Sequence, residues 1–172
     1  MKILQKGQPR LQTGYTLIEI LTSVVIITII FTVAIANFRD FQRRQQARSL
    51  GRELESNLRN AQSLALTGAK PDTPNCNSKT FAGIRVQIDT TTSYSVRALC
   101  DSAPVTLKTY TLPSNAVLKY SIPTNKFTFE ALGQGTDIAS TARIGVCVGS
   151  DGYGYKITST GEISQDTTFS CP

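Results

Sequence analysis

Residues 14–30 read GYTLIEILTSVVIITII, an almost wholly apolar run that contains a single carboxylate, Glu19. An ionised side chain at the centre of a bilayer costs roughly 2.5 to 3.5 kcal/mol even on lenient insertion scales. The acid is therefore costly in a segment that otherwise suits a membrane. Its presence predicts a specific use for Glu19, and the sequence on either side indicates which.

The apolar run is long enough to cross a bilayer. No charged residue occurs from Ile20 to Phe38, and as a helix these residues span roughly 28 Å, close to the roughly 30 Å hydrocarbon core. Residues 1–14 are polar, basic and short, and we interpret them as a leader peptide. We expect one transmembrane helix over residues 15–38.

A helical pattern continues beyond the apolar run. Apolar residues recur there at spacings of three or four, at Leu50, Leu54, Leu58, Ala61 and Ala65. This spacing predicts an amphipathic continuation of the helix over residues 39–67, which Gly68 and the prolines after it would end. Because the stripe is short, packing against the chain's own domain is preferred to a coiled coil.

The rest of the chain, residues 76–172, is predicted to be a β-rich globular domain. Its expected strands combine β-branched and aromatic residues, several with alternating polarity. They are residues 81–88, 93–100, 105–112, 116–122, 126–132, 143–149 and 153–159. Turn-forming residues separate them, and the Asp151-Gly152 step suits a tight hairpin. The expected fold class is α+β, a long N-terminal helix packed on a C-terminal antiparallel β-domain.

Composition argues against catalysis. The chain has no histidine, which is the commonest general base and metal ligand in proteins, and no acid-rich string marks a site. We therefore predict no enzyme activity, no cofactor and no metal. Asp137, Asp151 and Asp166 would bind calcium only if folding brought them together, and we expect them to be turn residues.

The net charge of +6 is unevenly distributed. Beyond residue 60, nine Lys or Arg face eight Asp or Glu, so the β-domain is nearly neutral. Arg143 and Lys156 are expected to be isolated, solvated cations there. Nucleic-acid binding normally requires basic residues gathered on the folded domain. Because the sequence shows no such cluster, nucleic acid is a possible but disfavoured partner.

The four cysteines, Cys76, Cys100, Cys147 and Cys171, all follow the apolar run. An even number behind a membrane anchor predicts two disulfides in an oxidising compartment, with three possible connectivities. Pairing Cys76 with Cys100 and Cys147 with Cys171 is favoured because both spans are 24 residues. Free thiols and a zinc site are less favoured, since no two cysteines stand close in sequence and histidine is absent.

Two ordinary uses of the N-terminal segment are alternatives. Ala34-Ile35-Ala36 has the pattern of a signal-peptidase site, so the chain could be a secreted or a singly anchored binding module. However, the run is long for a signal peptide, and cleavage after Ala36 would cut into the predicted helix. Basic residues on both sides leave the orientation open. Neither alternative explains Glu19.

The string Gly14-Tyr-Thr-Leu-Ile-Glu19, opening a long apolar helix, resembles the class III signal of type IV prepilins and pseudopilins. The resemblance implies that a prepilin peptidase cuts after Gly14 and that the new amine of Tyr15 is methylated. Glu19 becomes the fifth mature residue, where such proteins carry an acid that meets the N-terminal amine of a neighbouring subunit. Since an unpaired charge is costly in a low dielectric, Glu19 would set the register of assembly. Ala36 departs from the family, because many pilins have a helix-bending proline there.

A second resemblance lies in the β-domain. Residues 127–135 (FTFEALGQG) and 155–163 (YKITSTGEI) are similar to the paired strand-and-glycine signatures of the GspH/FimT group of minor pilins and pseudopilins. Any β-hairpin domain can place glycine after an apolar strand, so this signal is the weaker one. Some members of that group bind DNA through basic residues near the last glycine turn. This chain has Glu162 there, which argues against that role.

Together these features predict a minor pilin or pseudopilin with a pilin-like fold. Its segments would be a leader (1–14), a transmembrane and filament-core helix (15–38), an amphipathic continuation (39–67) and the β-domain (76–172). The implied partners are a prepilin peptidase that also methylates, other pilin or pseudopilin subunits, and the cytoplasmic membrane, with the C-terminal domain outside the cytoplasm. The filament would be a type IV pilus or a type II secretion pseudopilus.

Overall fold

The structure is a computed structural model that describes residues 14–74, 76–101 and 103–171. For residues 33–37 and 103 it describes the backbone alone. The chain divides into two compact units, Met1–Asp40 and Phe41–Pro172, and each is considered by itself. The predicted leader lies outside the described residues, apart from its last residue, Gly14.

One long α-helix, α1 (Leu17–Thr67), contributes to both units. It begins two residues later than the predicted helix and ends at the predicted residue. Gly68 ends it in the left-handed conformation, with φ of 63°. The N–H of Gly68 donates to the carbonyl of Ala65 (3.2 Å), and the next N–H, of Ala69, donates to the carbonyl of Leu64 (3.0 Å). These two bonds form a Schellman cap, which satisfies carbonyls that the helix leaves free.

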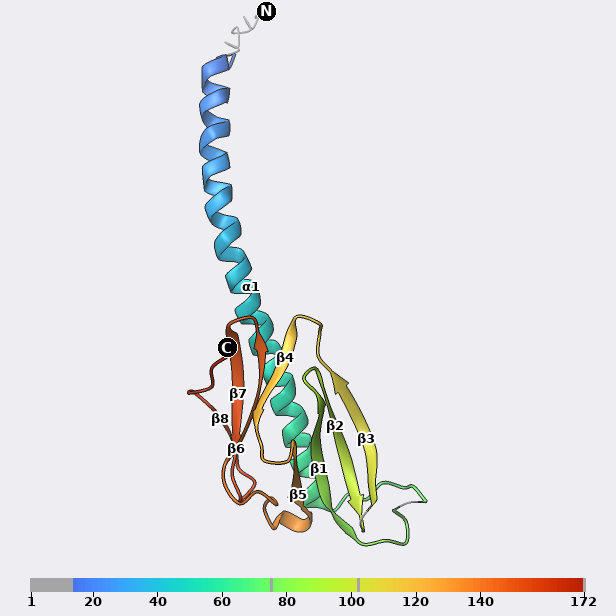
Figure 1. The fold of residues 1–172 in the computed structure, drawn as a ribbon. Coiled ribbons are helices and arrows are strands. Elements are labelled where there is room, and N and C mark those ends of the chain that lie inside the picture. The colour runs from blue at the N-terminus through green and yellow to red at the C-terminus, as the bar shows by residue number, and fades with distance from the viewer. Residues whose placement is uncertain (1–13, 75, 102, 172) are drawn as a thin grey trace, which may run out of the picture. The chain divides into compact units, whose positions relative to one another are not determined.

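The second unit contains two antiparallel four-stranded sheets (Figure 1). Sheet A has the strand order β3-β2-β1-β5, and sheet B has the order β4-β6-β7-β8. The elements are β1 (Phe81–Thr90), β2 (Ser93–Cys100), β3 (Ala103–Thr111), β4 (Ala116–Ser121), β5 (Lys126–Glu130), η1 (Ala131–Gly133), β6 (Ala142–Val148), β7 (Asp151–Ile157) and β8 (Ile163–Gln165). Every predicted strand is present and β8 is additional, so the α+β fold is confirmed.

The hairpin between β6 and β7 differs from the prediction. Val148 pairs with Asp151, so the two-residue turn is Gly149-Ser150 and not Asp151-Gly152. Gly149 has φ of 58°, a conformation that favours glycine at the first position of a tight hairpin turn. Gly152 instead lies inside β7, opposite Cys147.

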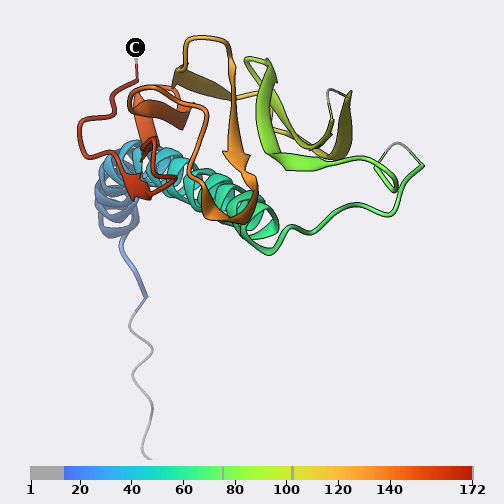
Figure 2. The same ribbon diagram turned by 90° about the horizontal axis from the view of Figure 1, so that it is seen from below.

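Residues 41–67 of α1 lie along one side of both sheets (Figure 2). Four of the five residues of the predicted stripe, Leu54, Leu58, Ala61 and Ala65, are buried with exposure of at most 1%, and Leu50 is partly buried against the same core. These side chains join one core cluster with residues from both sheets. Gly51 allows a close approach on the same side, because a Cβ there would lie 2.6 Å from the Cβ of Tyr153 on β7. The helix stripe therefore packs against its own domain, as the sequence predicts.

Two disulfides close loops in the second unit. Cys76 bonds to Cys100 at the end of β2, and Cys147 of β6 bonds to Cys171 near the C-terminus. This is the connectivity that the equal spacings favour. The first bond holds the segment between α1 and β1 against sheet A, and the second holds the C-terminal segment against sheet B.

Candidate functional site

The predicted processing site lies at the exposed start of α1. Gly14 and Tyr15 precede the helix, and Tyr15 is 79% exposed. Thr16 caps the helix, because its Oγ1 accepts a hydrogen bond from the backbone N–H of Glu19 (3.3 Å). The Gly14–Tyr15 peptide bond is therefore outside the helix and open to approach.

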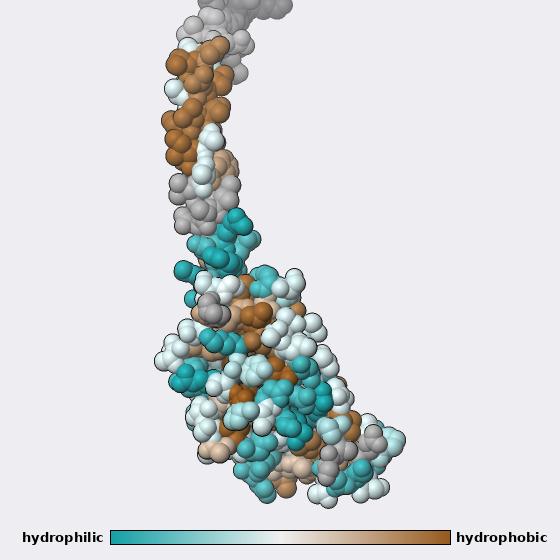
Figure 3. Space-filling view, viewed as in Figure 1, coloured by the Kyte–Doolittle hydropathy of each residue, from teal (hydrophilic) through white to brown (hydrophobic). Residues whose placement is uncertain are grey.

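The first part of α1 has an apolar surface that no described residue of its own unit covers. Every Leu, Ile, Val and Phe from Leu17 to Phe31 is more than half exposed. Figure 3 shows this stretch as a predominantly brown, apolar helix surface. Among the described residues, no helix is long and apolar enough to cross a membrane.

Hydroxyl groups in this stretch are satisfied by the helix itself. Thr22 and Ser23 both donate to the carbonyl of Glu19 (3.0 and 2.7 Å). Thr28 donates to the carbonyl of Val24 and Thr32 to that of Thr28. Such back-bonding lets Ser and Thr enter an apolar environment without water. The surface is therefore suited to contact with lipid or with another apolar helix.

Glu19 is the exception on this surface. It lies in the first turn of α1, where the helix dipole favours an acid. Its carboxylate is exposed and has no hydrogen bond or ion pair within the described part of the chain. The structure therefore leaves the carboxylate available to a cation from another molecule. The pairing predicted for it, with a neighbouring subunit's N-terminal amine, stays a prediction.

The two glycine signatures of the β-domain meet in the structure. The N–H of Thr136 donates to the carbonyl of Ser159 (2.8 Å), which joins the segment after β5 to the segment after β7. Gly135 has φ of 97°, and a Cβ there would overlap the carbonyl oxygen of Ser159. Gln62 of α1 donates to the carbonyl of Gly161 (2.9 Å). The signatures therefore connect sheet A, sheet B and α1, which is a structural use of the glycines.

Arg143 and Lys156 are not the isolated cations that the sequence suggests. Both pair with Asp166, whose side chain is fully buried: Lys156 Nζ lies 3.2 Å from Oδ1 and Arg143 Nε lies 3.5 Å from Oδ2. Burial raises the pKa of Asp166, but hydrogen bonds from the hydroxyl and N–H of Thr168 and from Lys156 more than offset it and hold the pKa below its usual value. The prediction was wrong because Asp166 is brought in by the C-terminal segment.

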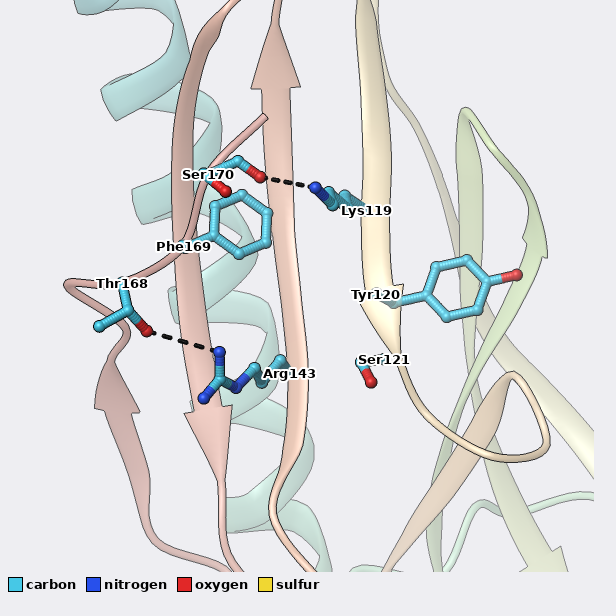
Figure 4. Close-up of a pocket in the computed structure, with 7 residues that line it drawn as sticks. All are labelled: Lys119, Tyr120, Ser121, Arg143, Thr168, Phe169 and Ser170. Atoms are coloured by element: carbon cyan, nitrogen blue, oxygen red, sulfur yellow. Dashed lines mark hydrogen bonds between the residues drawn. The ribbon is translucent and has the colours of Figure 1, made fainter. Parts of the chain in front are cut away.

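A pocket of about 280 Å³ opens beside this cluster (Figure 4). It is lined by Lys119, Tyr120, Ser121, Arg143, Thr168, Phe169 and Ser170. Lys119 donates to the carbonyl of Ser170 (2.8 Å), and Arg143 donates to Thr168 Oγ1 (3.4 Å). Both cations thus hold the C-terminal segment, and the lining offers no paired nucleophile and base for catalysis.

Phe169 packs on a glycine surface that sequence reasoning missed. Gly145 and Gly154 pair across β6 and β7, and a Cβ on either would meet the Phe169 ring. A Cβ on Gly152 would overlap the sulfur of Cys171. The three glycines therefore leave room for the C-terminal segment on the outer face of sheet B. Glycines at alternate positions of a strand, as at 152 and 154, are the signal that could have revealed this.

The three aspartates considered for calcium have other partners. Asp137 Oδ1 accepts from the N–H of Thr128 (2.6 Å), and Asp151 Oδ1 lies 3.5 Å from Nε of Arg44. Asp166 accepts from Thr168, two residues on, as a turn residue does. Within the described ranges no three His, Cys, Asp or Glu side chains are grouped so as to hold a metal ion.

Comparisons with known proteins identify the motif and the fold. A family model described as the prokaryotic N-terminal methylation motif matches residues 9–35. The structure is similar to that of the minor pseudopilin EpsH from the type 2 secretion system of Vibrio cholerae, with a TM-score of 0.51 and 10% sequence identity. That match covers 70% of this chain and 96% of the other. No curated protein sequence matches the chain. The chain thus carries a prokaryotic N-terminal methylation motif on a fold similar to that of a minor pseudopilin.

Proposed function

We propose that the chain is the precursor of a minor pilin or pseudopilin, cut by a prepilin peptidase after Gly14 and methylated on the new amine of Tyr15. Residues 15–38 then hold the subunit in the cytoplasmic membrane, with the β-domain outside the cytoplasm. Assembly transfers this helix from lipid into the core of a type IV pilus or a type II secretion pseudopilus. The methylation motif at residues 9–35 is the observation that carries the proposal.

The geometry of α1 supports this use. Its apolar side chains are exposed from Leu17 to Phe31, and its hydroxyls bond to the helix backbone. No charged residue follows Glu19 until Arg39. A helix of this kind loses little when it exchanges lipid for neighbouring helices, because both surroundings are apolar.

Glu19 gives the assembled helix its register in this proposal. In a low dielectric a carboxylate without a partner is strongly unfavourable, whereas a close carboxylate–amine pair offsets much of that cost. Cleavage after Gly14 creates such an amine on every subunit. The stagger that brings the Tyr15 amine of one subunit to Glu19 of another is therefore favoured over other registers.

The test is the N-terminal sequence and intact mass of the protein recovered from membranes of a host with a prepilin peptidase. The expected mature chain begins at methylated Tyr15. Gly14→Ala should abolish the cleavage, because the peptidase motif loses its glycine. Glu19→Ala should still be cut but should not enter filaments, since Glu19 acts at assembly.

Other N-termini would reject the proposal. A chain that begins at Asn37 would indicate ordinary secretion with cleavage after Ala36. A chain that keeps Met1 in the presence of the peptidase would indicate a simple anchor. Glu19→Ala subunits that assemble as well as the unmodified protein would leave the processing intact but refute the register role.

A further inference from the structure

A polar pocket opens where α1 passes β7 and the C-terminal segment. Its volume is about 270 Å³. Arg44 and Arg48 line it from α1, and Gln165 and Thr167 line it from the opposite side. All of its lining residues belong to the second unit. The charged residues of the lining are therefore two arginines and two aspartates, Asp151 and Asp166.

The acids of this pocket already have cationic partners. Asp151 Oδ1 lies 3.5 Å from Arg44 Nε, yet the Arg44 side chain remains 69% exposed. Asp166 is held by the two cations described above. Arg48 is exposed and has no ion pair in the part of the chain that the structure describes. With Arg143 and Lys156 counted, four cations therefore face the two aspartates, and the exposed Arg44 and Arg48 are accessible to an anion.

The surrounding sequence indicates the kind of anion. Residues 41–52, FQRRQQARSLGR, contain four arginines and no acid, and they follow the uncharged run closely. Phe41 is exposed at their start. Arg44 and Arg48 come six and ten residues after Phe38, about 9 and about 15 Å along a helix. Headgroups occupy the several ångströms outside the hydrocarbon core, and arginine side chains extend readily toward them.

We propose that Arg44 and Arg48 bind the phosphate groups of anionic phospholipids while the subunit is held in the membrane before assembly. The inference rests on the proposed function, because that function places residues 15–38 in the bilayer. Guanidinium groups suit phosphate oxygens because they offer two parallel N–H donors. Asp151 competes with a phosphate for Arg44, since its carboxylate Oδ1 already lies 3.5 Å from Arg44 Nε.

The first experiment counts lipids retained by the full chain, purified in a neutral detergent, by native mass spectrometry. The probes are phosphatidylglycerol and phosphatidylcholine at equal concentrations. The unmodified chain should prefer phosphatidylglycerol. Arg44→Gln with Arg48→Gln should weaken its binding roughly 30-fold, from about 1 kcal/mol for each basic residue near an anionic surface.

A matched control removes the same charge elsewhere. Lys108→Gln with Lys126→Gln changes two exposed cations on strands of sheet A and should leave the preference unchanged. Asp151→Asn should act in the opposite direction and strengthen phosphatidylglycerol binding by up to about fivefold, because one negative charge is removed from the pocket.

Several outcomes would overturn the inference. These are equal binding of both lipids by the unmodified chain, an equal loss in the lysine control, and displacement of the lipid by inorganic phosphate at the same concentration. The last would assign the pocket to a free anion. Cleavage after Gly14 is followed on the same proteins: its absence refutes the proposed function, whereas normal cleavage without a lipid preference refutes only this inference.

Discussion

A single methyl group added to β7 should displace the ring of Phe169. A Cβ on Gly154 would overlap Cγ and Cδ2 of that ring and would lie 2.8 Å from its Cβ. Carbon atoms in contact are normally about 3.5 to 4.0 Å apart, so the ring must move by about 1 Å or more. Gly154→Ala therefore removes the aromatic side chain from the surface on which it packs.

The size of the effect follows from two opposing contributions. Full burial of a Phe side chain stabilises by about 1.5 to 3 kcal/mol, and Phe169 is only half-buried. Its displacement should thus cost roughly 1 to 1.5 kcal/mol. Alanine in place of glycine within a strand stabilises the folded state by about 0.5 to 1 kcal/mol, because it lowers the conformational entropy of the unfolded chain. Gly154→Ala should be neutral to destabilising by up to about 1 kcal/mol.

The decisive measurement repeats Gly154→Ala in a Phe169→Ala background. There the ring atoms are gone, and the same substitution should stabilise by up to about 1 kcal/mol. The coupling between the two positions should therefore be about 1 kcal/mol or more. Urea unfolding of the full chain in detergent micelles, followed by tyrosine fluorescence because the chain has no Trp, measures it.

The control for this cycle is Gly14→Ala, because no atom lies within 4 Å of a Cβ at Gly14; all variants are made in a host without a prepilin peptidase, so that each keeps residues 1–14. It should leave the unfolding free energy unchanged. Effects of Gly154→Ala and Phe169→Ala that simply add, within about 0.3 to 0.5 kcal/mol, would refute the argument. They would mean that the ring does not rest on Gly154.

Three further predictions concern the same domain. A carboxyl whose folded-state pKa is lowered stabilises the fold above its unfolded-state pKa, and this contribution is lost as the pH falls through the lower folded-state value. The urea concentration at half-unfolding should therefore decrease as the pH is lowered below about 4, and Asp166→Asn should remove this decrease. An Asp166→Asn variant with the same pH dependence as the unmodified protein would contradict the burial of a paired Asp166. Replacing Cys147 and Cys171 together by Ser should cost about 3 to 4 kcal/mol by loop-closure entropy, and a midpoint equal to that of the oxidised protein would show that the loop is not closed. Gln62→Ala should cost about 1 kcal/mol through its hydrogen bond to the carbonyl of Gly161, and retained stability would show that this contact is dispensable.

Elements that depend on local sequence could be predicted. The helix stripe from Leu50 to Ala65 and Gly68 after it contain the signals for α1 and its end. The strand segments were found because β-branched and aromatic residues alternate between turns. β8 was missed because it is only three residues long, too short for an alternating pattern to show.

Contacts between distant segments could not be predicted in the same way. Arg143 and Lys156 read as lone cations because their partner, Asp166, reaches them only through the path of the C-terminal segment. The sequence predicts the hairpin turn at Asp151-Gly152 because that pair is common in turns. Gly152 is instead required because a side chain there would clash with the sulfur of Cys171. This contact exists only in the folded domain, so the local sequence does not reveal it.

The sequence could indicate which residues of the candidate site are unusual, but it could not indicate which groups they contact. Glu19 stands out because it is the only charge between Tyr15 and Phe38. Its counterpart is proposed to belong to another molecule, so neither the chain's pattern nor its fold contains it. The arginine pocket was not anticipated, because it needs β7 and the C-terminal segment beside α1.

The two disulfides also set how far this domain could stretch under tension. Each joins residues 24 apart in sequence, with Cα atoms 5.2 Å apart in one and 5.8 Å in the other. A free segment of that length could be drawn out to roughly 80 Å. Force that reaches the β-domain through α1 could therefore extend neither loop, and within residues 76–171 any lengthening would be confined to residues 101–146.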